Sequence, residues 1–367
     1  MQDTSQSPQL PHSASYIIST NSYPKNSLKS HSFSSNSKCN SPITKKIKYL
    51  SLDKKDHNIL LVKKSNDERA SRALQTLISS CTRSQRYLAQ ERPQIKTLVE
   101  EDLTHTTESK KNIDLVIALG GDGTVLHISH LFKRTVCPPI LGFNLGTIGF
   151  LLPFAPVDCL EVITQVLNGK IGVEERMRLD CFVGDHRTQP RSGERIDGEI
   201  ESSEEKFTPS NSLHRNDCPH MVEINISIEN RFLTQAVADG LIIATPTGST
   251  AYSCSAGGPI VYPFMEAMLL TPICPRSLSF RPLVLPADLH VQLAANPKSR
   301  STAELRVDGI AIKTIRPGEA IEIRRSNHPI HIFSPPNSNA FVHDYWINDL
   351  NMMLNFNRSY QPKAPLL

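Results

Sequence analysis

The sequence lacks any long hydrophobic run. No window approaches about 18 consecutive apolar residues, which excludes a helix that spans a membrane. The net charge is also small, since 40 Lys and Arg nearly balance 36 Asp and Glu over 367 residues. The resulting +4 does not indicate a nucleic-acid partner. The eight cysteines include no CxxC pair and no zinc-ligand spacing, and a chain this long needs no disulfides, so we expect a reducing compartment.

Residues 1–56 lack arginine altogether, and they contain no acidic residue between Asp3 and Asp53. Their eight Lys and three Asp give +5, so the other 311 residues sum to −1. Fourteen of the 56 are serine and no apolar periodicity is present, which predicts a disordered tail. A Ser-rich, basic and acid-poor segment is also typical of a mitochondrial transit peptide, apart from the missing arginine. Both interpretations stay open.

Residues 57–174 alternate between short apolar runs and segments of helical periodicity, which predicts an α/β domain with a parallel sheet. Asn66 or Asp67 can cap the first helix, and Gly169 can end the last one. The expected strands are 59–62, 114–119 and 139–143, and the expected helices are 67–81, 125–132 and 157–167.

The pattern changes after about residue 175, where apolar and polar residues alternate with period two. Such alternation predicts antiparallel strands and an all-β domain over 175–335. Within it, the polar stretch 184–217 is expected to be a surface insertion. Residues 346–354 place their apolar side chains on one helical face, so we expect the segment 336–367 to contain a helix that returns to the first domain.

The first motif with chemical meaning is Gly-Gly-Asp-Gly-Thr at 120–124, between an expected strand and an expected helix. Glycines at that edge of a sheet let backbone N–H groups approach phosphate oxygens, and the helix N-terminus favours negative charge. The negative charge of Asp122 would be unfavourable beside phosphates unless Asp122 binds a metal or removes a proton. The alternative is a tight turn with an Asp cap.

Two further segments extend the candidate site. A second glycine-rich loop, 142–151, follows the next strand at the same sheet edge. Residues 238–258 then combine Asp239 with a dense run of hydroxyls that begins at Thr245. A hydroxyl-rich helix cap is the alternative for this run, although so many hydroxyls exceed what a cap needs.

Together these motifs resemble the NAD kinase family. The matching stretches are GGDGT at 120–124, NLGTIGFL at 144–151, ERMRLDC at 175–181, ADGLIIATPTGSTAY at 238–252, SAGGPI at 255–260, TPICPRSLSFRPLVLP at 271–286 and VDG at 307–309. GGDGT is shared with lipid kinases and phosphofructokinases, whereas TPTGSTAY is specific to NAD kinases. The sequences of residues 213–221, 274–283 and 348–360 are similar to those of the fungal mitochondrial branch of NADH kinases.

The resemblance implies a Rossmann-like α/β domain, a β-sandwich-like domain and an active site between them, in a homo-oligomer. It implies transfer of the γ-phosphate of ATP, with Mg²⁺, to the adenosine-ribose 2′-hydroxyl of NAD or NADH. Asp122 is then the general base. The implied phosphate-binding residues are Gly120, Gly121, Gly123, Thr124, Asn144 and Gly146, and the implied NAD-binding residues are His127, Asp239, Thr247, Gly248, Ser249, Thr250, Ala251, Tyr252, Ser253 and Ser255. No residue is assigned as a direct metal ligand.

One departure from the family stands out. NAD kinases usually carry an Asn-Glu or Asn-Asp pair where this chain has Pro209-Ser210, and that pair helps to hold the dinucleotide. The loss motivates one alternative function, a catalytically weak homologue that binds dinucleotide as a regulatory subunit. A lipid kinase that shares GGDGT is another. The tail favours the mitochondrial matrix, with the cytoplasm as the alternative, and the choice between NAD and NADH stays open.

Overall fold

The structure is a computed structural model that describes residues 47–49, 56–87, 94–100, 103, 112–133, 136–185, 206–208, 210–215, 219–335 and 344–354. Most of the expected tail and most of the expected insertion therefore lie outside the described residues. Within these ranges, no helix is long and apolar enough to cross a membrane.

Seven of the described strands form a sheet in the order β1-β6-β19-β5-β4-β2-β3. The pairs β2–β3, β2–β4, β4–β5 and β5–β19 are parallel, while β6 pairs antiparallel with both β19 and β1. The parallel part confirms the expected α/β domain. The strands are β1 (Ile47–Tyr49), β2 (Asp56–Lys63), β3 (Gln94–Val99), β4 (Leu115–Gly120), β5 (Ile140–Asn144), β6 (Gly172–Arg176) and β19 (Ile330–Ser334).

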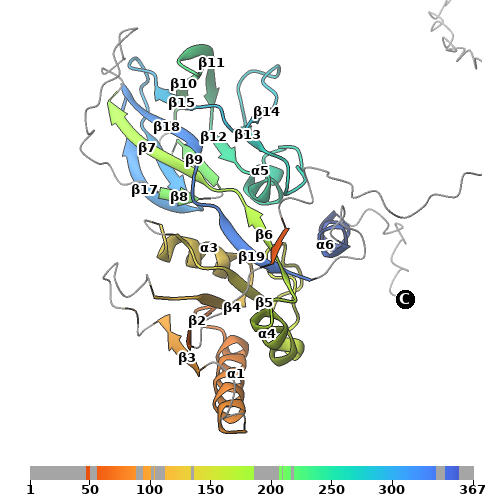
Figure 1. Ribbon diagram of the computed structural model, residues 1–367. Helices are drawn as coiled ribbons and strands as arrows, with labels where there is room; N and C mark the ends of the chain where they lie inside the picture. Colours follow the sequence, from red (N-terminus) through yellow and green to blue (C-terminus); the bar gives the residue numbers. More distant parts are fainter. Residues whose placement is uncertain are drawn as a thin grey trace, which may run out of the picture. The chain divides into compact units, whose positions relative to one another are not determined.

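Helices cover both faces of this sheet, because alternate residues of its strands point to opposite sides. Ile117 belongs to one apolar cluster with Leu77 of α1 (Glu68–Tyr87) and with α4 (Cys159–Leu167), which follows the short helix η3 (Pro156–Asp158). Its neighbour Val116 belongs to the other cluster, with Ile128 of α3 (Asp122–Leu131). Figure 1 shows α1 and α4 on the side of the sheet opposite α3.

The expected cap of α1 and the expected glycine after α4 are both present, although α1 extends to Tyr87 rather than ending at residue 81. The Asp67 carboxylate caps α1, since its Oδ1 accepts hydrogen bonds from the N–H of Arg69 at 2.9 Å and of Ala70 at 3.3 Å. The hydrogen bond from the Arg69 side chain holds the pKa of Asp67 below its usual value. Gly169, just after α4, adopts φ of 65°, which suits glycine.

The second domain is a sandwich of two antiparallel sheets. Apolar residues from both sheets, such as Ile226 and Ile243, meet in one shared core. One sheet contains, in order, β11 (Arg231–Ala238), β10 (Val222–Ile228), β15 (Val291–Ala295), β18 (Glu319–Arg325), β7 (Leu179–Asp185) and β8 (Lys206–Thr208). The other contains β14 (Leu283–Pro286), β13 (Ala267–Ile273), β12 (Gly240–Ala244), β9 (Ser210–His214), β16 (Ala303–Val307) and β17 (Ile310–Ile315).

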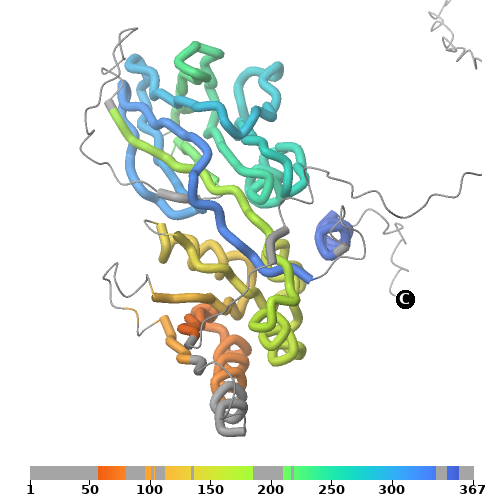
Figure 2. The backbone as a smooth tube through the Cα atoms, in the orientation of Figure 1, coloured from red at the N-terminus to blue at the C-terminus, as the bar shows by residue number. Residues whose placement is uncertain are grey.

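Two adjacent crossings join the domains, and Figure 2 shows them as a green and a blue segment that run side by side. The first links β6 to β7 through Met177 and Arg178, and the second links β18 to β19. The N–H of Ser326 donates to the carbonyl oxygen of Arg178 at 2.9 Å, which ties the crossings together. Helix α6 (Asp344–Leu354) then packs on β6, as expected for a helix that returns to the first domain.

Several segments differ from the sequence expectations. Residues 47–49 of the expected tail form β1, and Ser210–His214 of the expected insertion forms a strand inside the second sheet of the sandwich. Ile330–Ser334 belongs to the first sheet rather than to the all-β domain, and β6 runs across the expected boundary at 174/175. Each depends on a partner that is distant in sequence, so local periodicity carries no signal for it.

Candidate active site

The Gly-Gly-Asp-Gly-Thr motif forms a strand-to-helix turn in which α3 begins at Asp122 rather than at 125. The Thr124 N–H donates to the carbonyl oxygen of Gly121 at 2.8 Å. A Cβ atom on Gly120 would lie 2.2 Å from Thr124 Oγ1, so packing demands glycine there. At Gly121 and Gly123 an added Cβ meets no atom within 4 Å. The space beside both glycines lies at the N-terminus of α3, where anions are favoured, although the Gly121 N–H already donates to Thr124 Oγ1 at 3.4 Å.

The Asp122 carboxylate is held by the second glycine-rich loop. Its Oδ1 accepts a hydrogen bond from the Leu151 N–H at 3.0 Å, and its Oδ2 accepts one from the Phe150 N–H at 3.2 Å. Burial raises the pKa of Asp122 above its usual value, against the lowering effect of these two hydrogen bonds. Asp122 is thus a fixed carboxylate with enhanced proton affinity, which suits a general base.

The second loop lies beside the first, as expected. The Leu145 N–H donates to the carbonyl oxygen of Gly120 at 2.7 Å, and the Asn144 side-chain oxygen accepts from the Gly146 N–H at 2.8 Å. At Gly149, an added Cβ would lie 2.8 Å from Asn144 Nδ2. Asn144 therefore shapes the loop from within, and the Gly146 N–H expected to face phosphate already has a partner.

His127 is exposed on α3, one turn after Asp122. Its Nε2 lies 2.6 Å from Oε1 of Glu100, at the carboxyl end of β3. The contact places His127 at the sheet edge that carries both glycine-rich loops. Sequence reasoning did not single out Glu100, because β3 shows no clear apolar pattern.

The hydroxyl-rich run follows β12 as two short helices, η4 (Thr247–Thr250) and α5 (Tyr252–Ser255). Two hydroxyls within these helices point into the protein. Buried Ser249 donates to the Pro246 carbonyl oxygen at 2.6 Å and accepts from the Val261 N–H at 3.0 Å. Buried Ser253 bonds to Thr271 at 2.9 Å between hydroxyl oxygens.

The other members of this run divide by exposure. Gly248 is buried, and its N–H donates to Thr245 Oγ1 at 3.2 Å. Thr247 and Thr250 are partly exposed, and the Thr250 hydroxyl donates to the Thr247 carbonyl oxygen at 3.3 Å. The residues open to solvent are Ala251, Tyr252 and Ser255.

Tyr252 presents an aromatic face at the surface, with 48% of the residue exposed. Its ring stacks on His214 with centroids 5.7 Å apart and planes inclined by 16°. Burial lowers the pKa of His214, so its ring favours the neutral form. Asp239 lies between β11 and β12, where its Oδ1 pairs with Nε of Arg215 at 3.2 Å. This arrangement offers a flat ring and an acid to a dinucleotide.

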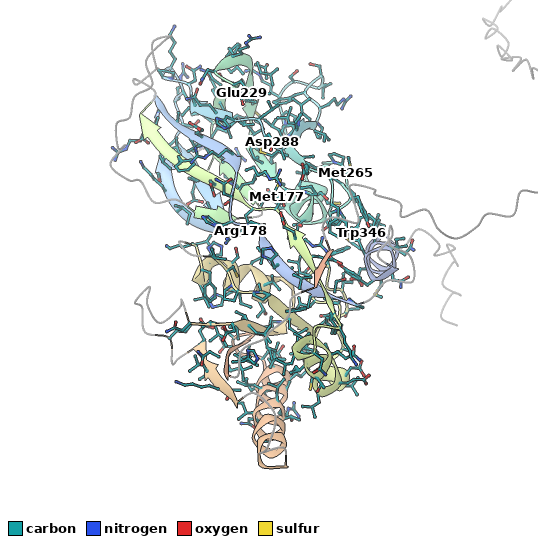
Figure 3. All side chains as sticks on the ribbon, in the orientation of Figure 1. Met177, Arg178, Glu229, Met265, Asp288 and Trp346 are labelled. Atoms are coloured by element: carbon teal, nitrogen blue, oxygen red, sulfur yellow. The ribbon has the colours of Figure 1, made fainter. Side chains whose placement is uncertain are left out.

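Polar contacts fasten α3 to the sandwich. The buried Arg178 donates from Nη1 to the hydroxyl of Ser129 at 3.3 Å, and Figure 3 shows Arg178 near α3 at the junction between the domains. On the next residue of α3, His130 Nε2 lies 3.3 Å from Oδ2 of Asp308. The Asp308 Oδ1 accepts from the N–H of Ser210 at 3.0 Å, at the position of the missing family pair. The Val-Asp-Gly motif thus connects this position to α3.

Comparison with known proteins identifies the family. The ATP-NAD kinase N-terminal domain matches residues 43–171, and the ATP-NAD kinase C-terminal domain matches residues 210–334. The mitochondrial NADH kinase of Schizosaccharomyces pombe is 36% identical over 333 residues, which cover 87% of this chain and 80% of that protein. The chain belongs to the NAD kinase family. It is an ATP-dependent phosphotransferase of the NAD(H) kinase class.

Other relatives agree with this assignment. The NAD(+) kinase of Saccharomyces cerevisiae is 38% identical over 256 residues, which cover 68% of this chain and 47% of that protein. The crystal structure of yeast NADH kinase complexed with NADH has a TM-score of 0.71 at 30% identity, and the match covers 88% of this chain and 97% of that one. An NAD kinase from Archaeoglobus fulgidus in complex with ATP shares the fold at 23% identity, with a TM-score of 0.56.

Proposed function

We propose that this NAD kinase transfers the γ-phosphoryl group of Mg·ATP to the adenosine-ribose 2′-hydroxyl of NAD(H). The Asp122 carboxylate accepts the hydroxyl proton as the 2′-oxygen attacks the γ-phosphorus, and ADP leaves with the bridging oxygen. The observation that carries this role is the geometry of Asp122, oriented by two backbone N–H groups at the N-terminus of α3. A positioned base contributes about 10²–10⁴-fold to the rate.

We assign the phosphates to the space beside Gly121 and Gly123, at the positive end of α3. Positioning and charge neutralisation dominate phosphoryl transfer, so this cradle carries much of the catalysis. Among the described residues, no group of three or more His, Cys, Asp or Glu could hold a metal. We propose that Mg²⁺ enters as part of the Mg·ATP substrate, with phosphate oxygens and water as its main ligands.

We propose that the exposed residues of the hydroxyl-rich run line the dinucleotide pocket. Tyr252 supplies a stacking face for a base, and Asp239 can accept hydrogen bonds from ribose or amide groups. We place Thr250, Ala251 and Ser255 along the pocket and assign Ser249 and Ser253 to its internal support, because both are buried and hydrogen-bonded within the protein.

Purified protein, ATP with Mg²⁺, and either NAD or NADH form the test. Mass spectrometry should detect 2′-phosphorylated product with at least one of the two dinucleotides, and the rate ratio gives the preference between them. Absence of product with both would contradict the proposed function and favour the regulatory-subunit alternative.

We also propose a mitochondrial location and a homo-oligomeric state. The mitochondrial NADH kinases among the relatives and the basic, Ser-rich composition of residues 1–56 support the location. A fluorescent protein fused to residues 1–56 should enter mitochondria, and a diffuse cytosolic signal would contradict import. Light scattering on the purified enzyme measures its mass, and a monomer of 40.8 kDa would contradict the oligomer.

A further inference from the structure

The last residue of β9, His214, has a side-chain ring that is held from two sides. Its Nε2 lies 2.9 Å from the hydroxyl oxygen of Ser212, two residues earlier on the same face of the strand. Its partner in the antiparallel ladder with β12 is Gly240. A Cβ atom on Gly240 would lie 3.4 Å from Nδ1 of His214, so the ring packs against the glycine backbone. These two contacts restrict the rotation of the His214 ring.

Tyr252, the first residue of α5, stacks on this restrained ring. The ring centroids lie 5.7 Å apart and the planes are inclined by 16°, which is within the range that aromatic pairs prefer. His214 covers one face of the tyrosine ring, and 48% of Tyr252 is exposed. A base can therefore stack on Tyr252 only at the face opposite His214.

The pairing of β9 with β12 also places the acid of the proposed pocket. The Arg215 N–H donates to the carbonyl oxygen of Asp239 at 2.9 Å, and Arg215 Nε lies 3.2 Å from Asp239 Oδ1. His214 and Arg215 are consecutive, as are Asp239 and Gly240. One position of the ladder therefore supports both the stacking ring and the carboxylate.

We propose that His214 is a positioning residue for the dinucleotide. Its ring holds Tyr252 at the angle at which the outer face of the tyrosine can stack on a base of NAD(H). This inference rests on the proposed dinucleotide pocket. It assigns a role in binding to β9, the strand at whose first residue, Ser210, the acidic residue of the family is missing.

The neutral form of the imidazole suits this role. Burial lowers the pKa of His214, and the charge of Arg306 lowers it further, whereas Glu304 opposes the shift. Arg306 and Glu304 both belong to β16 and form an ion pair with each other, so their effects on the ring partly cancel. At neutral pH the ring is therefore uncharged, and an uncharged aromatic side chain can replace it in a test.

A purely structural role for His214 makes a different prediction. His214→Ala removes the ring, and His214→Gln removes it but keeps an amide that can bond to the Ser212 hydroxyl. His214→Phe keeps a flat ring and loses that polar contact. His290→Ala removes another histidine of the sandwich, with a 52% exposed side chain, as the matched control.

The experiment measures the dissociation constant for NADH by calorimetry, and the kcat and both KM values with NADH and Mg·ATP, for the full-length enzyme and these variants. His214→Ala and His214→Gln should raise the dissociation constant and the KM for NADH about three- to tenfold. The KM for ATP and kcat should stay near wild type. His214→Phe should remain within about twofold of wild type, because a stacking ring is retained. His290→Ala should equal wild type.

A double variant tests whether His214 acts through Tyr252. In the Tyr252→Ala background, His214→Ala should change the affinity for NADH by less than about twofold, because the ring that it positions is gone. A further loss as large as that of His214→Ala alone would show that His214 acts without Tyr252 and would overturn the inference.

Other outcomes would also contradict the inference. Wild-type affinity for NADH in His214→Ala, with only a lower melting temperature, would assign His214 a structural role alone. Equal losses in the Phe and Ala variants would show that stacking is not the cause. If wild-type enzyme bound NADH but formed no product, the proposed function would fail, and calorimetry would still decide the role of His214. Wild-type enzyme that bound no NADH would contradict the pocket and this inference together.

Discussion

His130 and Asp308 meet where the two domains adjoin, with Nε2 of His130 3.3 Å from Oδ2 of Asp308. His130 lies two turns after the proposed base on the same helix, and Asp308 lies in the turn between β16 and β17. The Asp308 side chain is 2% exposed. The pair therefore holds the helix of the catalytic motif against the sandwich.

Removal of the Asp308 side chain should destabilise the protein. Asp308→Ala leaves the Ser210 N–H and the His130 ring without their partner, which costs about 1–3 kcal/mol of unfolding free energy. Asp308→Asn should cost less, because its amide oxygen still accepts from Ser210. Urea denaturation measures both, and Asp288→Ala, with an 83% exposed side chain, is the control. Equal stability of the Ala variants at 308 and 288 would contradict this account.

Gly120 should be the least replaceable glycine of the catalytic motif. A Cβ there would lie 2.2 Å from Thr124 Oγ1 and 3.1 Å from Lys64 Cβ, so Gly120→Ala should lower the unfolding free energy by about 1–3 kcal/mol. Gly121→Ala meets no atom within 4 Å and should cost less. The double variant Gly120→Ala/Thr124→Ala should recover part of the loss, because the clashing oxygen is gone. Urea midpoints that are the same for the two single variants would refute this packing argument.

Tyr252 should contribute to dinucleotide binding. Stacking of a base on an aromatic ring contributes about 1–3 kcal/mol, so Tyr252→Ala should raise the KM for NAD(H) by about tenfold or more. Tyr252→Phe keeps the ring and should remain near wild type. Steady-state kinetics with each substrate varied in turn provide the test, with Phe232→Ala as an exposed aromatic control. The prediction fails if Tyr252→Ala changes the KM for ATP but not for NAD(H).

Ser249 should matter for stability rather than for ligand contact. Its hydroxyl joins the Pro246 carbonyl oxygen to the Val261 N–H, so Ser249→Ala should cost about 1–2 kcal/mol. Ser255→Ala, at an exposed position, should stay within about 0.5 kcal/mol of wild type. Thermal denaturation distinguishes the two. If Ser249→Ala raised the KM for NAD(H) without a loss of stability, the prediction would be wrong and Ser249 would be a dinucleotide-binding residue.

The sequence sufficed for those parts of the fold where local pattern decides structure. The continuous apolar run that forms β4 is buried throughout, and the glycine-rich motif that begins at its last residue marks the passage into α3. Asp67 was recognisable as a cap because a short acceptor before a helical pattern bonds to its own backbone. The same reasoning brought the loops after β4 and β5 to one edge, since parallel strands end together.

The parts of the fold that the local sequence pattern did not predict depend on contacts between residues that are distant in sequence. Strand β9 contains one large apolar residue, Leu213, in a polar stretch, and becomes a strand because β12 and β16 flank it. Hydroxyl density likewise could not separate Ser249, which turns inward, from Ser255, which faces solvent.

The central claim is that Asp122 is the base that activates the 2′-hydroxyl. The most direct measurement compares kcat/KM across pH for wild type and Asp122→Asn, with binding of ATP and NADH measured by calorimetry. Because burial raises the pKa of Asp122, wild-type activity should begin to fall with decreasing pH above the usual range of an aspartate. Asp122→Asn should lose about 10²–10⁴-fold of kcat while it still binds both nucleotides. A variant with near wild-type turnover and an unchanged acid limb would contradict the account.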